Sequence, residues 1–176
     1  ETQKQLFNHP CIIAYTIFNE GWGQFESDRL YAQAKKADPT RLYDSTSGWF
    51  AQKDSDFDSI HIYFGPGKPK VKKRPVFLSE FGGYSYLVPE HVYTGKRYWY
   101  GTCKSSEKWF ERLSARYEEL VLPYIKDGLC GSVYTQISDV EDEINGLYTY
   151  DRKVCKVDKA SMQALASKIY NEIENS

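Results

Sequence analysis

The stretch Cys11-Ile-Ile-Ala-Tyr-Thr-Ile-Phe-Asn-Glu20 decides the fold class, because a nearly unbroken apolar run leads directly into an acidic residue. Such a run predicts a parallel strand over residues 11–18 that is buried on both faces. Pro75-Val-Phe-Leu-Ser-Glu80 repeats the pattern and is followed by Phe-Gly-Gly. Glutamate is rarely buried without a partner, so Glu20 and Glu80 are the first candidates for functional residues.

Outward from these two stretches, the sequence alternates between strand and helix patterns. Hydrophobic periodicity predicts a helix tail over 1–9, strands at 42–45, 59–64, 76–81 and 130–136, and helices at 27–37, 106–126 and 161–174. Ser27 or Asp28 is the expected cap of the first long helix. The alternation predicts an α/β fold with a parallel sheet, in which residues 65–74 form an irregular link and residues 84–104 a long aromatic loop.

Composition narrows the function classes. The net charge of −1 offers no basic field for nucleic acid, and no apolar stretch reaches the roughly 18 residues that span a bilayer. We therefore expect neither a nucleic-acid partner nor a membrane partner. The chain begins at Glu1 without a signal-peptide pattern, which is typical of a piece of a longer protein and leaves both a cytoplasmic and a secreted location open.

The four cysteines are spread along the chain without a C-x-x-C pair, so neither a disulfide framework nor a zinc site is expected. Cys11 and Cys130 fall in apolar strand runs and are predicted to be small core residues. Among the acidic residues, the run from Asp139 to Glu143 permits a calcium loop, but its glycine falls late, and a solvated acidic loop is the better interpretation.

Aromatic residues make up 16% of the chain, and many follow predicted strands. A single aromatic residue usually closes a core, but aromatic rings gathered at strand ends also suit the C–H faces of sugars. The candidates for such contacts are Trp22, Trp49, Trp99 and Tyr134.

Several segments, taken in order, resemble glycoside hydrolase family 2, the family of β-galactosidases, β-glucuronidases and β-mannosidases. Asn8-His9-Pro10 with Asn19-Glu20 is similar to the acid/base signature of the fourth barrel strand, and His61-Ile-Tyr63 is similar to the motif of the sixth strand. Pro75 to Gly83 resembles the seventh strand, which carries the nucleophile, and the segment from Tyr134 to Arg152 resembles the eighth strand and its loop.

The resemblance implies a retaining β-glycosidase that acts by double displacement and needs no metal or other cofactor. Glu20 would be the general acid/base and Glu80 the nucleophile. Asn19 would donate to the sugar 2-hydroxyl, and His61 and Tyr63 would line the sugar subsite. The implied partner is a carbohydrate substrate.

The resemblance also implies the fold: residues 1–176 would form the C-terminal portion of a (β/α)8 TIM barrel, about strands 4 to 8. The first three barrel strands and the β-sandwich domains that precede them in the family are absent. Tyr134 stands where many relatives carry Trp. The alternative is a catalytically inactive half-barrel that binds carbohydrate or self-associates through its open edges.

Overall fold

The computed structural model describes residues 1–65, 67–95 and 101–176. Its elements are α1 (Thr2–Leu6), β1 (Ala14–Asn19), α2 (Ser27–Ala37), β2 (Leu42–Ser47), β3 (Asp58–Ile62), β4 (Val76–Gly82), β5 (Ser85–Tyr86), β6 (Thr102–Cys103), α3 (Ser106–Leu120), the 3-10 turn η1 (Leu122–Tyr124), β7 (Leu129–Thr135) and α4 (Lys159–Glu174).

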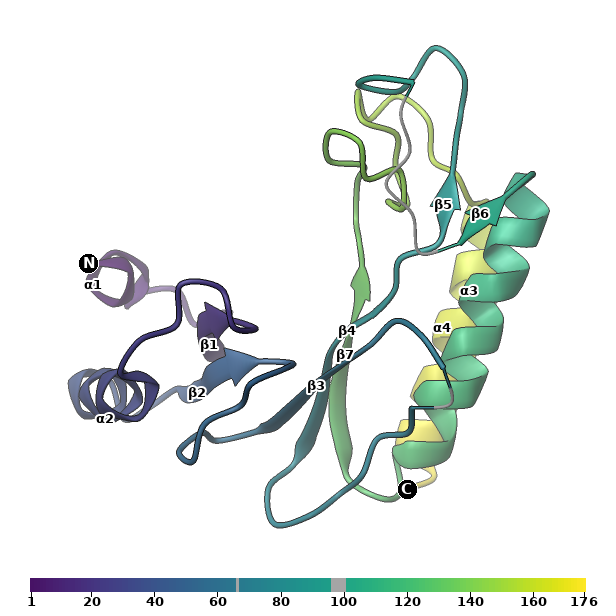
Figure 1. Ribbon diagram of the computed structural model, residues 1–176. Coiled ribbons are helices and arrows are strands. Elements are labelled where there is room, and N and C mark those ends of the chain that lie inside the picture. The colour runs from purple at the N-terminus through teal and green to yellow at the C-terminus, as the bar shows by residue number, and fades with distance from the viewer. Residues whose placement is uncertain (66, 96–100) are drawn as a thin grey trace.

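The long strands form a row that follows chain order. β1 pairs with β2, and β3, β4 and β7 form a second hydrogen-bonded group, every pair being parallel as the alternating pattern predicts. The backbone N–H of Gly48, after β2, donates to the Ser59 hydroxyl on β3 at 3.4 Å and joins the two groups. Figure 1 shows α3 and α4 side by side against β3, β4 and β7, while α1 and α2 lie beside β1 and β2.

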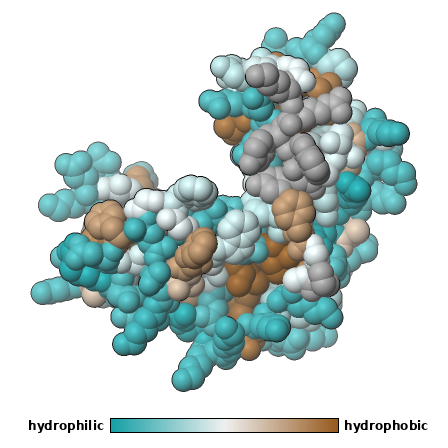
Figure 2. All heavy atoms as spheres, viewed as in Figure 1, coloured by the Kyte–Doolittle hydropathy of each residue, from teal (hydrophilic) through white to brown (hydrophobic). Residues whose placement is uncertain are grey.

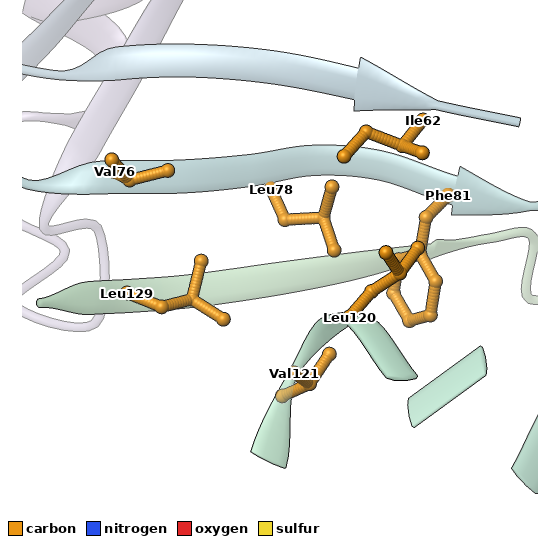
Figure 3. Close-up of a cluster of buried hydrophobic side chains, with 7 residues drawn as sticks. All are labelled: Ile62, Val76, Leu78, Phe81, Leu120, Val121 and Leu129. Atoms are coloured by element: carbon orange, nitrogen blue, oxygen red, sulfur yellow. The ribbon is translucent and has the colours of Figure 1, made fainter. Parts of the chain in front are cut away.

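The main core lies between β3, β4, β7 and the end of α3. Figure 3 shows its side chains converging from the three strands onto the last turn of α3: Ile62, Val76, Leu78, Phe81, Leu120, Val121 and Leu129. A second cluster surrounds Trp109, which is fully buried and donates its indole N–H to the carbonyl of Tyr84 at 2.7 Å. Both clusters belong to the half of the molecule that carries Glu80.

The β1 end of the row is much less covered than predicted. β1 begins at Ala14 and has exposed residues on both of its faces, so the prediction of a strand buried on both faces is wrong for this chain. Cys11 and Cys130 are exposed rather than in the core. The reason is the same for both: β1 and β7 are the outer strands of the row, and within the described ranges neither has a partner on its far side.

Two helix boundaries also differ from prediction. α3 ends at Leu120 rather than near residue 126, because Pro123 cannot continue the helix and a 3-10 turn follows instead. α2 is capped by neither Ser27 nor Asp28: its N-cap is Glu26, in a left-handed conformation and without a side-chain cap bond. None of the helices that the structure describes is long and apolar enough to cross a membrane.

Candidate functional site

The carboxyl ends of the parallel strands bring the candidate residues to one edge of the sheet. Glu20 directly follows β1, while His61 on β3 lies in register with Glu80 on β4. Tyr63 follows β3, and Thr135 is the last residue of β7. Because parallel strands all end on the same side, residues far apart in sequence meet here, which is the arrangement that the strand-end glutamates predict.

His61 lies between the two glutamates. Its Nδ1 is 2.8 Å from Glu20 Oε1 and 3.3 Å from Glu80 Oε2. The imidazole is buried, whereas the Glu80 side chain is 29% exposed and the Glu20 side chain 12%. Both carboxylates are therefore held by one buried ring and still face solvent.

The hydrogen bonds favour one tautomer of His61. Both glutamate contacts are made by Nδ1, and the buried Nε2 has no hydrogen-bond partner among the described residues. A proton on Nδ1 can be donated to a carboxylate, whereas a proton on buried Nε2 would have no acceptor. We assign the neutral ring to the Nδ1–H form.

Glu80 is held at one oxygen. The Tyr63 hydroxyl donates to Glu80 Oε2 at 2.5 Å and lies 3.0 Å from the Thr135 hydroxyl. Oε2 is also the oxygen nearest to His61. Both contacts are thus made to Oε2, and neither involves the other oxygen of Glu80.

The backbone around Glu20 is held in an uncommon conformation. Glu20 has φ +51°, a region that non-glycine residues rarely occupy. Its N–H donates to the Ser47 carbonyl at 2.9 Å, and its carbonyl accepts from the Gln24 side chain at 2.8 Å. The neighbouring Asn19 accepts from the Ser47 hydroxyl at 2.8 Å, so the end of β2 fixes both Asn19 and Glu20.

A pocket of about 590 Å³ opens beside Glu20. Trp22 and Trp49, both predicted from sequence, contribute to its walls, and the Trp49 ring centroid lies 6.0 Å from that of His61. The lining is completed by Gly21, Gln24, Phe50 and Gln52. Glu20 lines this pocket, whereas Glu80 does not.

One predicted sugar contact, Tyr134, is not brought into this group. Tyr134 packs edge-on against Phe81 and Trp109, and its hydroxyl donates to the carbonyl of Asn145 at 3.0 Å, so its ring serves the core. Burial raises the pKa of the Tyr134 hydroxyl well above its ordinary value. Trp99 lies outside the described residues.

Sequence reasoning missed Thr135, Phe50 and Gln52. Thr135 could have been found, because it ends a predicted strand just as Glu20 and Glu80 do. Phe50 and Gln52 reach the pocket through a turn in which Gly48 has φ +72° and Phe50 has φ +63°, and no periodic pattern signals that turn. A buried carboxyl, Asp44 on β2, was also missed, and burial raises its pKa.

The acidic loop contains a buried ion pair that composition did not reveal. Lys156 donates to Asp139 Oδ1 at 2.6 Å, and both side chains are fully buried. The Gly146 N–H donates to the same oxygen at 2.8 Å, and the Ile144 carbonyl accepts from the lysine at 3.0 Å. The interpretation as a solvated loop is wrong for Asp139, which is buried. Its carboxylate pairs with the Lys156 ammonium, which occupies the position that a calcium ion would need.

The arrangement of Glu20, His61 and Glu80 allows two kinds of chemistry. One ligand-type atom from each lies within 4.8 Å of the other two, a spacing that could also hold a divalent metal. A metal on Nδ1 would have to displace the proton that His61 shares with the carboxylates. Two carboxylates this close, beside an open pocket, are equally suited to acid and nucleophile work on one bond.

Neither protein-family models nor curated proteins give a match to this chain.

Proposed function

We propose that the protein is a retaining β-glycosidase, with Glu80 as nucleophile and Glu20 as general acid/base. The carrying observation is the short separation of the two carboxylates, each of which has an oxygen within 4.8 Å of the other and of His61 Nδ1. Retaining glycosidases hold their two carboxyl groups about 5–5.5 Å apart, whereas inverting enzymes leave about 6.5–9.5 Å for a water molecule.

In the first step, Glu80 attacks the anomeric carbon and the glycosidic C–O bond breaks. The proton of the Glu20 carboxyl passes to the departing oxygen, which leaves as an alcohol. In the second step, Glu20, now a carboxylate, takes a proton from water, and the hydroxide oxygen displaces Glu80 from the anomeric carbon. The sugar is released with its original anomeric configuration.

The hydrogen bonds around Glu80 fit this role. Tyr63 and His61 both contact Oε2, which leaves the other oxygen for attack. In the second step the same donors would stabilise the negative charge that returns to Glu80 as it departs. Asn19, beside Glu20, would contact the sugar 2-hydroxyl.

The same proposal covers the fold. The row of parallel strands in chain order, with helices alongside and polar residues at the carboxyl ends, fits strands 4 to 8 of a (β/α)8 barrel. In such a barrel, strands 1 to 3 would lie between β7 and β1.

The second candidate is a half-barrel that binds carbohydrate, or associates with itself, without turnover. It is favoured by the outer strands β1 and β7, which carry exposed apolar residues such as Ile13, adjoining β1, and Val133. Unpaired edges of this kind invite strand pairing with another chain. An open site would also lack the walls that normally exclude water from the reaction.

One experiment separates the two candidates. We would incubate the chain with 2-deoxy-2-fluoro β-glycosyl fluorides of galactose, glucose, mannose and glucuronic acid, and measure intact mass. We expect one of them to add a single sugar to the native chain and to Glu20→Gln, because fluoride leaves without a proton, but not to Glu80→Gln. If none of the four sugars forms an adduct, the chain does not turn over these glycosides, and the binding-only candidate is favoured. EDTA should leave labelling unchanged. Abolition of labelling by EDTA would indicate that Glu20, His61 and Glu80 hold a divalent metal instead.

A further inference from the structure

The pocket beside Glu20 is lined in large part by aromatic side chains. Its rings are strongly exposed: Trp22 at 81%, Phe50 at 70% and Trp49 at 49%. Large aromatic side chains gathered in one exposed patch typically mark a binding surface. In Figure 2, hydrophobic side chains also appear among the hydrophilic ones on the half of the molecule formed by α1, α2, β1 and β2.

The amide group of Gln24, in the lining of the pocket, is already engaged. The Gln24 amide nitrogen donates to the carbonyls of Glu20 and Phe50, at 2.8 and 3.3 Å, and its oxygen accepts from Ser27 at 3.0 Å. The Gln52 amide nitrogen also donates to the Phe50 carbonyl, at 3.0 Å. Gln24 therefore has no amide hydrogen left for a ligand, and three of the seven lining residues of the pocket offer ring surface.

The backbone of the pocket is built into an uncommon shape. Glu20 and Phe50 both have positive φ, +51° and +63°, although neither is glycine. A Cβ on Gly21 would meet the Phe50 ring at 2.9 Å, so the glycine makes room for that ring. Such conformations cost free energy and persist where surrounding contacts hold them, which is common at ligand sites.

We propose that this pocket is the leaving-group subsite and that it takes an aromatic alcohol rather than a second sugar. The proposal rests on the function proposed above. Glu20 protonates the departing oxygen, so whatever is attached to that oxygen lies on the Glu20 side of the site, where this pocket is. Flat rings stack well on Trp22, Trp49 and Phe50, whereas the Gln24 amide has no hydrogen left to donate to the hydroxyls of a sugar.

Binding can be measured separately from turnover with hydrolysis-resistant ligands. We would determine the Kd of phenyl and methyl 1-thio-β-glycosides of the four sugars by calorimetry. Covering one aromatic ring in the pocket should make the best phenyl ligand bind about ten- to hundredfold more tightly than its methyl partner. Trp22→Ala should bring this ratio close to one. Tyr170→Ala, which removes an aromatic ring of similar exposure from α4, should leave it unchanged.

Three outcomes would overturn the subsite: equal binding of phenyl and methyl ligands, an unchanged preference in Trp22→Ala, or tighter binding of a 1-thio-disaccharide than of the phenyl ligand. None of these depends on labelling of Glu80. Labelling of Glu80 without a phenyl preference would retain the glycosidase and overturn the subsite. A phenyl preference without labelling would overturn the glycosidase and, with it, the leaving-group role of the pocket.

Discussion

Single residues set the geometry of the carboxylate pair, and Gly48 is the clearest case. Its φ of +72° favours glycine, and a Cβ at this position would lie 2.3 Å from the His61 ring. His61 is buried and holds Glu20 through Nδ1, so it cannot move away without releasing that carboxylate. The absence of a side chain at residue 48 therefore gives His61 its place.

We predict that Gly48→Ala displaces the His61 ring and lowers labelling of Glu80 by more than tenfold. Gly23→Ala is the matched control, because Gly23 also has a positive φ, +67°, but nothing lies within 4 Å of its Cβ position. Both variants should lose a similar free energy of unfolding from the backbone, about 1 kcal/mol. Equal labelling rates in the two variants would show that His61 does not position the carboxylates.

The pair Asp139 and Lys156 holds the loop after β7 at the scale of the element. We predict that Lys156→Met lowers the free energy of unfolding by about 3–5 kcal/mol, because it leaves a buried carboxylate without its ammonium. Urea unfolding measures this loss. Adding Asp139→Asn should restore part of the stability, since Asn can still accept from the Gly146 N–H. A single variant as stable as the native chain would mean that the pair contributes nothing.

Asp56 ties α2 to β2. It accepts from Tyr31 at 3.0 Å, from Lys35 at 2.8 Å and from the Tyr43 N–H at 2.7 Å. Burial raises the pKa of Asp56, but these hydrogen bonds outweigh it and hold the pKa below its ordinary value. A carboxyl whose pKa is lowered by folding stabilises the protein above its unfolded pKa, about 3.9, and loses this contribution as pH falls through the folded pKa.

We therefore predict that Asp56→Asn costs about 1–3 kcal/mol in the free energy of unfolding at pH 7. The difference from the native chain should begin to shrink as pH falls below about 3.9, where the carboxyl of the unfolded chain becomes protonated, and should be lost once pH has fallen through the lowered pKa of the folded chain. Urea unfolding at pH 7, 4 and 3 gives the comparison. A difference that stays constant over this range would contradict the lowered pKa.

The elements show where sequence reasoning succeeds and where it stops. The parallel strands were predictable from apolar runs, and Glu20 and Glu80 from the cost of placing a carboxylate at a buried strand end. The ion pair between Asp139 and Lys156 was not predictable, because the loop after β7 brings these two residues together although they are distant in sequence. Phe50 was missed for a related reason: its position follows from a turn conformation, not from a periodic pattern.

Burial was the least predictable property at the scale of the whole molecule. The sequence around β1 predicts a strand covered on both faces, yet Ile13, just before it, is 72% exposed. An apolar run indicates that a strand needs neighbours to cover it. In the described part of the chain, β1 and β7 each lack a neighbouring strand on their outer side. The exposed edges of β1 and β7 are the reason to expect self-association.

We predict that the chain associates at tens of micromolar, measured by light scattering coupled to size-exclusion chromatography. Ile13→Lys with Val133→Lys should shift it toward the monomer, because charged side chains at strand edges oppose pairing with another chain. Lys substitutions at Ala32 and Gln33, exposed positions on α2, are the control and should not change the mass. A native chain that is monomeric and melts cooperatively would contradict the prediction.

The strand order has a consequence for synthesis on the ribosome. β4, which carries Glu80, pairs with β3 before it and with β7 after it, yet β7 begins only at Leu129. At translation rates of about 5–20 residues per second, β4 waits on the order of several seconds with one side unpaired. The strand that carries Glu80 is thus the last inner strand of the row to gain its second neighbour, and chaperones have that interval in which to bind the emerging chain.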